Sequence, residues 1–137
     1  MTSWPKCAAV VVGMLLVLTA CSSPADQVGQ FAKQAAAAEQ SAAYGASLFR
    51  AGKAPQPETT TLLQDSMKEL TTAEQSLAQM RATGRDAATQ HAALTAVRRA
   101  TDALLAAQRE LDGGTLSAKT AKQLRAAAEA LKRVEQR

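Results

Sequence analysis

Apolar positions recur at intervals of three and four along most of the chain, with polar residues between them. This spacing gathers the apolar side chains on one face of an α-helix. No stretch of useful length alternates apolar and polar residues as a half-buried strand does. Good helix formers (Ala, Leu, Gln, Glu, Lys and Arg) dominate these stretches. The pattern therefore predicts an all-α protein.

Glycine and proline interrupt this pattern at three places after residue 21. They are the segment 51–57 (AGKAPQP), Gly84, and the segment 112–114 (DGG). Glycine just after one helix and proline at the start of the next is the usual arrangement of helix caps. The predicted helices run from Pro24 to Arg50, from Pro57 to Thr83, from Asp86 to Leu111 and from Ser117 to Val134. We expect Ser23, Asp86 and Ser117 to act as N-caps, and Gly84 to end the second helix in the left-handed conformation.

Short connections make successive helices antiparallel, so we expect an up-and-down helical bundle of four helices. The alternative is a three-helix bundle in which the first segment is a tether or a loosely docked helix. Phe31 and Phe49 supply most of the apolar bulk of that first segment. The expected core positions are Val28, Phe31, Ala35, Ala38, Ala42, Gly45 and Phe49 in the first helix; Leu63, Met67, Leu70, Ala73, Leu77 and Met80 in the second; Ala87, Leu94, Val97, Thr101, Leu104 and Leu111 in the third; and Ala121, Leu124, Ala128, Leu131 and Val134 in the fourth.

The amino-acid composition also limits the fold classes that are possible. The 137 residues suit one domain, and 32 of them are alanine while only 3% are aromatic. That composition argues against a β-sandwich or barrel. Alanine lets helices approach closely but buries little apolar area, so we expect a thin core and modest stability.

The N-terminal segment is typical of a signal peptide. Lys6 precedes a run from Ala8 to Ala20 that is apolar except for Thr19. As a helix these 13 residues would span about 20 Å, which is short of the roughly 30 Å hydrocarbon core of a membrane. The segment 1–20 is therefore predicted to direct export, and 21–137 is the predicted mature domain.

Leu18-Thr19-Ala20-Cys21 resembles the lipobox of bacterial lipoproteins. The resemblance implies that the Cys21 thiol takes a diacylglyceryl group, that cleavage precedes Cys21, and that its new amino group is acylated. Two or more chains anchor a protein stably. Ser22 is not the Asp associated with inner-membrane retention, so the resemblance implies the periplasmic face of the outer membrane in a Gram-negative cell. In other cells it implies the outer face of the cell membrane.

Catalytic, metal and cofactor sites find little support in the sequence. His91, the single histidine, has Ala87, Ala88, Leu94 and Thr95 one turn away, which supply no acid and no second ligand. Glu58, Asp65, Glu69 and Glu74 come without the Glu-x-x-His pattern of a di-metal bundle. With Cys7 removed and Cys21 acylated, the mature chain has no free thiol. We therefore expect no enzyme activity, no metal and no cofactor.

Charge is distributed unevenly along the chain. Residues 22–80 carry four basic and six acidic side chains, whereas residues 81–137 carry eleven basic and six acidic ones. Basic residues of the second half that are candidates for contact with an anionic surface are Arg98, Arg99, Lys119, Lys122, Arg125, Lys132 and Arg133. The alternative is a solvated face with ion pairs such as Glu129 with Arg133. Nucleic acid is not an expected partner, because no aromatic residues lie between the positive charges.

Two functional hypotheses remain from the sequence. The first is a membrane-anchored, non-catalytic bundle that contacts an envelope protein or associates with itself. The second is a small-ligand carrier or sensor that binds between helices, which an interior cavity near Phe49, Met67 and Met80 would favour.

Overall fold

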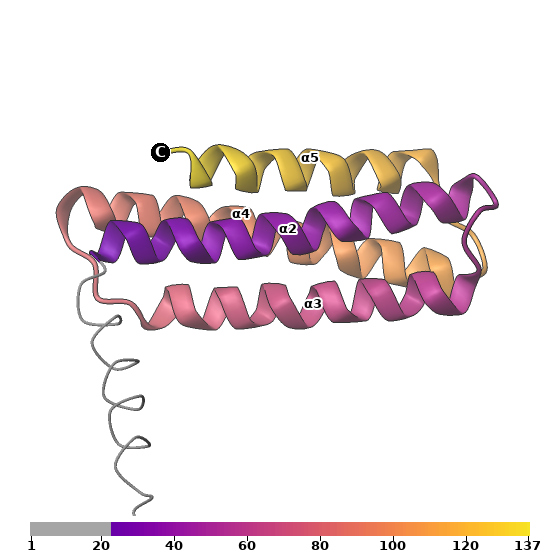
Figure 1. Cartoon of the computed structure of the whole chain (residues 1–137), viewed down its shortest axis with the longest axis horizontal. Helices are drawn as coiled ribbons and strands as arrows, with labels where there is room; N and C mark the ends of the chain where they lie inside the picture. Colours follow the sequence, from indigo (N-terminus) through magenta and orange to yellow (C-terminus); the bar gives the residue numbers. More distant parts are fainter. Residues whose placement is uncertain (1–22) are drawn as a thin grey trace, which may run out of the picture.

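The computed structural model describes residues 23–137, which form four α-helices and no strand (Figure 1). Helix α2 spans Pro24–Arg50, α3 spans Gln56–Gln79, α4 spans Gly84–Asp112 and α5 spans Ala118–Glu135. The prediction of an all-α, four-helix bundle is therefore confirmed. The predicted signal peptide, the lipobox and Cys21 lie outside the described residues.

Successive helices run antiparallel and contact one another, and α5 closes the bundle by packing against α2 (Figure 1). One diagonal of the bundle is short, because α2 also contacts α4. Across the other diagonal, the backbones of α3 and α5 lie farther apart, with no Cα atoms within 8 Å of each other. Since α2 contacts every other helix, the alternative in which this segment is a tether or a loosely docked helix is wrong.

Small side chains explain why α2 can lie against three neighbours. Its buried residues are Val28, Ala32, Ala35, Ala36, Glu39, Ala42, Ala43, Gly45 and Ala46. At Gly45 the end of the Leu62 side chain from α3 occupies the space that a Cβ atom would take, so a larger residue there would require Leu62 to shift. Phe31 and Phe49, expected to supply most of the apolar bulk, are only partly buried at the edge of the core.

Leucines from the other three helices fill the centre of the bundle. Leu63, Leu70 and Leu77 of α3, Leu104 and Leu111 of α4, and Leu124 and Leu131 of α5 are all fully buried. Each of them is a predicted core position, so the three-four spacing identified the inward faces of these helices. None of the helices within residues 23–137 has the length and apolarity that crossing a membrane requires.

Two of the three predicted N-caps are confirmed. Ser23 accepts a hydrogen bond from the Asp26 amide at 3.2 Å, and the Asp26 side chain accepts one from the Ser23 amide. Ser117 accepts from the Thr120 amide at 3.1 Å. These bonds satisfy amide groups that have no partner inside the helix.

The connection between α3 and α4 differs from the prediction. Helix α3 ends at Gln79 rather than Thr83, and α4 begins at Gly84 with Thr83, not Asp86, at the N-cap position. The side-chain amide of Gln90 donates to the backbone carbonyls of Leu77 and Met80. These bonds satisfy carbonyls that a longer α3 would have used. Gly84 has the expected positive φ of 59°, but at the beginning of α4.

Candidate functional site

The residues considered for catalysis or metal binding do not converge. His91 is exposed on α4, while Glu58, Asp65 and Glu69 are exposed on α3. Glu74 accepts a hydrogen bond from Arg98 at 2.8 Å. Within residues 23–137 no three metal-ligating side chains lie close enough together to hold an ion.

Five of the seven candidate basic residues share the exposed side of α5, which we call the basic face: Lys119, Lys122, Arg125, Lys132 and Arg133. At about 100° per residue, Lys122 and Arg133 lie opposite the buried stripe of Leu124 and Leu131, and Arg125 lies toward α2, where it lines a groove. Glu129 is exposed within the same face, so its charge interrupts the positive surface.

The other two basic residues, Arg98 and Arg99, lie on different sides of α4. Arg98 is bonded to Glu74 on α3, so it is turned away from α5 and its charge is paired. Arg99 lines a groove between α4 and α5. The structure therefore brings Arg99 next to the basic face and separates Arg98 from it. The reason is that adjacent positions on a helix point in directions about 100° apart.

The groove between α4 and α5 has a volume of about 430 Å³ and is lined mostly by small residues. Ala103 and Ala106 come from α4, and Ala126, Ala127 and Ala130 come from α5. Arg99 and Asp102 contribute one charge of each sign at its rim. The groove is open to solvent, and its small side chains leave room for the ridge of another helix.

A second open groove, of about 560 Å³, runs between α2 and α5. Ala43, Tyr44 and Ser47 line it from α2, and Arg125 and Ala128 line it from α5. Tyr44 is 65% exposed, and it also borders a smaller groove between α2 and α3. In the part of the chain that the structure describes, the exposed large hydrophobic residues are Tyr44 and Leu105. The α2–α5 groove is thus lined by an aromatic ring together with an arginine and the carboxylate of Glu129.

Among the buried residues that the structure describes, Glu39 on α2 is the one with an ionisable side chain. Its exposed fraction is 0%, and neither carboxyl oxygen has a hydrogen-bond partner. The buried residues one turn before and after it on α2 are alanines. Burial raises the pKa of Glu39 from 4.5 to about 8, so the carboxyl is mainly protonated at neutral pH.

A different carboxylate joins α4 to α5. Glu110 accepts hydrogen bonds from the Ser117 amide at 2.7 Å and from the Thr120 hydroxyl at 2.6 Å. The hydroxyl of Thr120, with help from the Ser117 amide, lowers the pKa of Glu110. A negative charge at the beginning of α5 also interacts favourably with the helix dipole. This contact fixes the end of α5 from which the basic face begins.

Sequence reasoning missed Glu39 and Tyr44. Glu39 lies four residues after Ala35 and three before Ala42, so it occupies the predicted stripe, and that spacing was a usable signal. Tyr44 lies next to Gly45, a predicted core position, and its exposure depends on where α3 and α5 lie against α2. Comparison of the chain with protein-family models, with curated proteins and with solved structures finds no match.

Proposed function

We propose that this protein is a lipid-anchored, non-catalytic module that binds a protein partner in the bacterial cell envelope. The observation that supports it most is the α2–α5 groove, which the exposed ring of Tyr44 lines together with Arg125. Tyrosine and arginine are the residue types that most often carry the binding energy of protein interfaces. Tyr44 is 65% exposed, so most of its surface is available to a partner that packs into the groove.

The proposed anchor is Cys21, acylated as the lipobox resemblance implies. Helix α2 begins at Pro24, so two residues separate it from the acylated Cys21, and the distance between the two can be at most about 10 Å. Such a short connection keeps the start of α2 close to the bilayer. We propose the outer membrane as the location in a Gram-negative cell and the outer face of the cell membrane otherwise.

A protein partner suits these surfaces better than a small ligand does. The grooves beside α5 are open and shallow, whereas small-molecule sites bury most of the ligand surface. Phe49, Met67 and Met80, the residues at which a ligand cavity was expected, line none of the grooves described above. These three side chains pack instead against the core.

Photo-crosslinking in intact cells tests the proposal directly. A photoreactive residue at Tyr44 should give a crosslink to one defined envelope protein, identified by mass spectrometry. The matched control is the same residue at Leu105, the other exposed large hydrophobic position, which lies on α4. We expect the Tyr44 adduct to disappear when Arg125 is changed to Ala. An absence of adducts at Tyr44, or identical adducts from both positions, would contradict the proposal.

A further inference from the structure

Opposite charges lie at opposite edges of the bundle. The exposed side of α3, which we call the acidic face, carries Glu58, Asp65 and Glu69 together with one basic residue, Lys68. The basic face of α5 carries one acidic residue, Glu129. Because α3 and α5 lie on the long diagonal of the bundle, these exposed faces point away from each other, with α2 and α4 between them (Figure 1).

Helices α3 and α5 run in the same direction and begin at the same level of the bundle. The Gln56 side chain, in the first turn of α3, donates to the carbonyl of Leu111 at 2.7 Å. Ser117, at the N-cap of α5, donates its amide to Glu110 at 2.7 Å. Both helices are thus tied to the last turn of α4. Since each rises about 1.5 Å per residue, positions equally far from Gln56 and Ser117 lie at similar levels, to within about one helical turn.

This register aligns opposite charges on the two faces. The alignment includes the one basic residue of the acidic face and the one acidic residue of the basic face. Lys68, twelve residues after Gln56, lies at the level of Glu129, twelve residues after Ser117. Asp65 lies within one residue of the level of Arg125. Glu69 lies within two residues of the level of Lys132.

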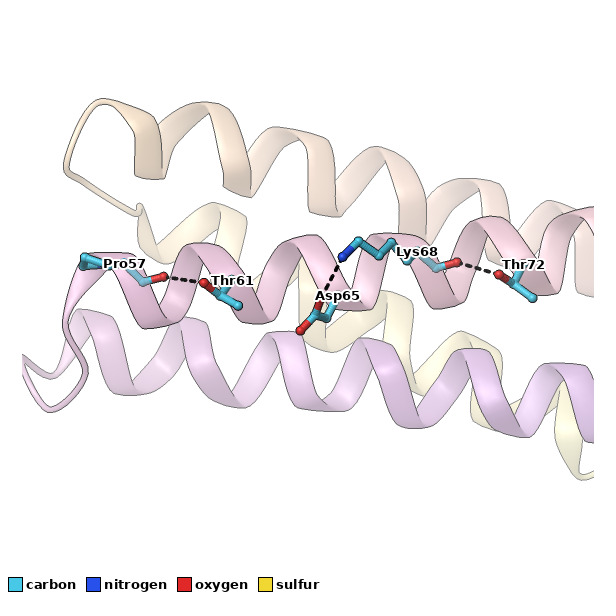
Figure 2. A network of polar contacts seen from close by, with 5 residues as sticks. All are labelled: Pro57, Thr61, Asp65, Lys68 and Thr72. Atoms are coloured by element: carbon cyan, nitrogen blue, oxygen red, sulfur yellow. Dashed lines mark hydrogen bonds and ion pairs between the residues drawn. The ribbon is translucent and has the colours of Figure 1, made fainter.

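The charged groups of the acidic face are accessible to a partner. Lys68 and Asp65 form an ion pair at 3.1 Å, yet their side chains remain 77% and 62% exposed (Figure 2). Glu69 accepts a hydrogen bond from Gln34 at 3.2 Å, and this neutral amide leaves its negative charge in place. Glu74 does not belong to this face, because it is only partly exposed and its ion pair with Arg98 turns it toward α4.

We propose that copies of this protein assemble side by side, with the basic face of α5 in one copy against the acidic face of α3 in the next. The contact is heterologous, so it repeats into open rows rather than closing as a dimer. Each copy is related to the next by a displacement across the bundle, which keeps the start of α2 at the same end in every copy. Anchoring of all copies in one membrane is compatible with this arrangement and raises their effective concentration.

Lys68 is the one basic residue of the acidic face, and Glu129 is the one acidic residue of the basic face. Their alignment favours a second copy, rather than an anionic lipid surface, as the occupant of the basic face. Lipid headgroups attract the five basic residues but repel Glu129, and they give no role to a basic residue on α3. In the contact with a second copy, Lys68 of one copy lies against Glu129 of the other, so each of these two residues meets an opposite charge. Exposed ion pairs are individually weak and are screened by salt, so the assembly needs several of them and should be salt-sensitive.

Cysteine crosslinking of the full-length chain in its own membranes tests the contact. Gln64 on α3 and Ala126 on α5 are exposed, uncharged and close in level, so a chain carrying both Gln64→Cys and Ala126→Cys should form disulfide ladders on mild oxidation. Chains carrying one of the two substitutions are the controls, and neither should form a ladder. High salt during oxidation should reduce the ladder several-fold. A double variant without a ladder overturns the assembly.

Charge exchange then distinguishes this contact from chance collision. One chain carries Arg125→Glu, Glu129→Lys and Lys132→Glu, the other carries Asp65→Lys, Lys68→Glu and Glu69→Lys, and both contain the two cysteines. Each chain expressed singly should lose at least 80% of the ladder, and co-expression should restore it. Equal helical circular dichroism verifies that both chains fold. A ladder that ignores these changes overturns the proposal.

Two other outcomes also overturn the assembly and identify what occupies the basic face instead. The first is salt-sensitive binding of the wild-type chain to phosphatidylglycerol vesicles without any ladder, which assigns the face to lipid. The second is crosslinking from Ala126 to a different protein and not to another copy. The second outcome leaves the proposed function standing, because that proposal is tested separately at Tyr44.

Discussion

Ser66 on α3 donates its hydroxyl proton to the backbone carbonyl of Ala38 on α2, with 3.0 Å between the two oxygen atoms. The next residue after Ala38 is Glu39, whose carboxyl group is buried without a hydrogen bond. Since the buried Ser66 hydroxyl has one proton and has already given it to the backbone, it cannot also donate to Glu39. The bundle therefore contains an ionisable group that is most stable in its neutral form.

The first prediction concerns the pH dependence of stability that Glu39 imposes. Its pKa is about 8 in the folded protein and 4.5 ordinarily, so the folded state keeps its proton where the unfolded state loses it. The stabilising effect of this proton is fully present below pH 4.5 and is lost as pH rises through 8. Over this window the free energy of unfolding should fall by up to about 1.4 kcal/mol per pH unit. Urea unfolding at pH 5, 7 and 8.5 measures this change in the free energy of unfolding.

Glu39→Gln should remove this slope, because the amide does not titrate, whereas Glu129→Gln, at an exposed position, should leave it in place. Glu39→Met should raise the free energy of unfolding at pH 8 by about 1–3 kcal/mol, since an apolar side chain needs no partner. Equal slopes in wild type and Glu39→Gln would show that Glu39 is solvated or paired in solution.

The second prediction concerns the contact between Glu110 and the beginning of α5. Glu110→Gln should lower the melting temperature at pH 7, because the carboxylate accepts bonds from Ser117 and Thr120. The pKa of Glu110 is lowered in the folded protein, so its contribution is present above pH 4.5 and is lost as pH falls through the folded value. The difference from wild type should therefore shrink at pH 3. A constant difference at both pH values would argue against a charged interaction.

The third prediction concerns the core leucines. Leu70→Ala, Leu77→Ala, Leu104→Ala and Leu131→Ala should each cost about 2–5 kcal/mol of stability, because these side chains are fully buried. Leu105→Ala is the matched control on α4, where the side chain is 38% exposed. Its cost should be about 0.5 kcal/mol. Similar costs at Leu104 and Leu105, measured by chemical denaturation, would mean that α4 is rotated from its position in this structure.

The fold could be predicted from the sequence because each helix carries its own signals. Gly52, Gly84 and Gly114 mark the connections, and each has a positive φ. Leucines that recur every seven residues, within stripes of three-four spacing, define the inward faces of α3, α4 and α5. The end of α3 could not be predicted, because it depends on bonds from Gln90, a residue of the next helix. A contact between helices has no signature in local spacing.

The surfaces were less predictable than the core. Adjacent basic residues in the sequence, Arg98 and Arg99, lie on different sides of α4, and only the position of Glu74 on α3 shows which of them is paired. Glu39 lies at the spacing of the apolar stripe, which indicates an inward position, but the absence of any hydrogen-bond partner for its carboxyl follows from how α2 packs against its neighbours. The alignment of Lys68 with Glu129 requires knowing that α3 and α5 begin at the same level.

Metabolic labelling with radioactive palmitate tests the central claim, a lipid-anchored bundle, most directly. The two cysteines of the chain provide a matched pair of variants, Cys7→Ala and Cys21→Ala. The account predicts label on the membrane-bound wild type and on Cys7→Ala, and none on Cys21→Ala, which should also leave the membrane fraction or remain uncleaved. Label that persists in Cys21→Ala, or an unlabelled wild-type chain in the soluble fraction, would contradict it.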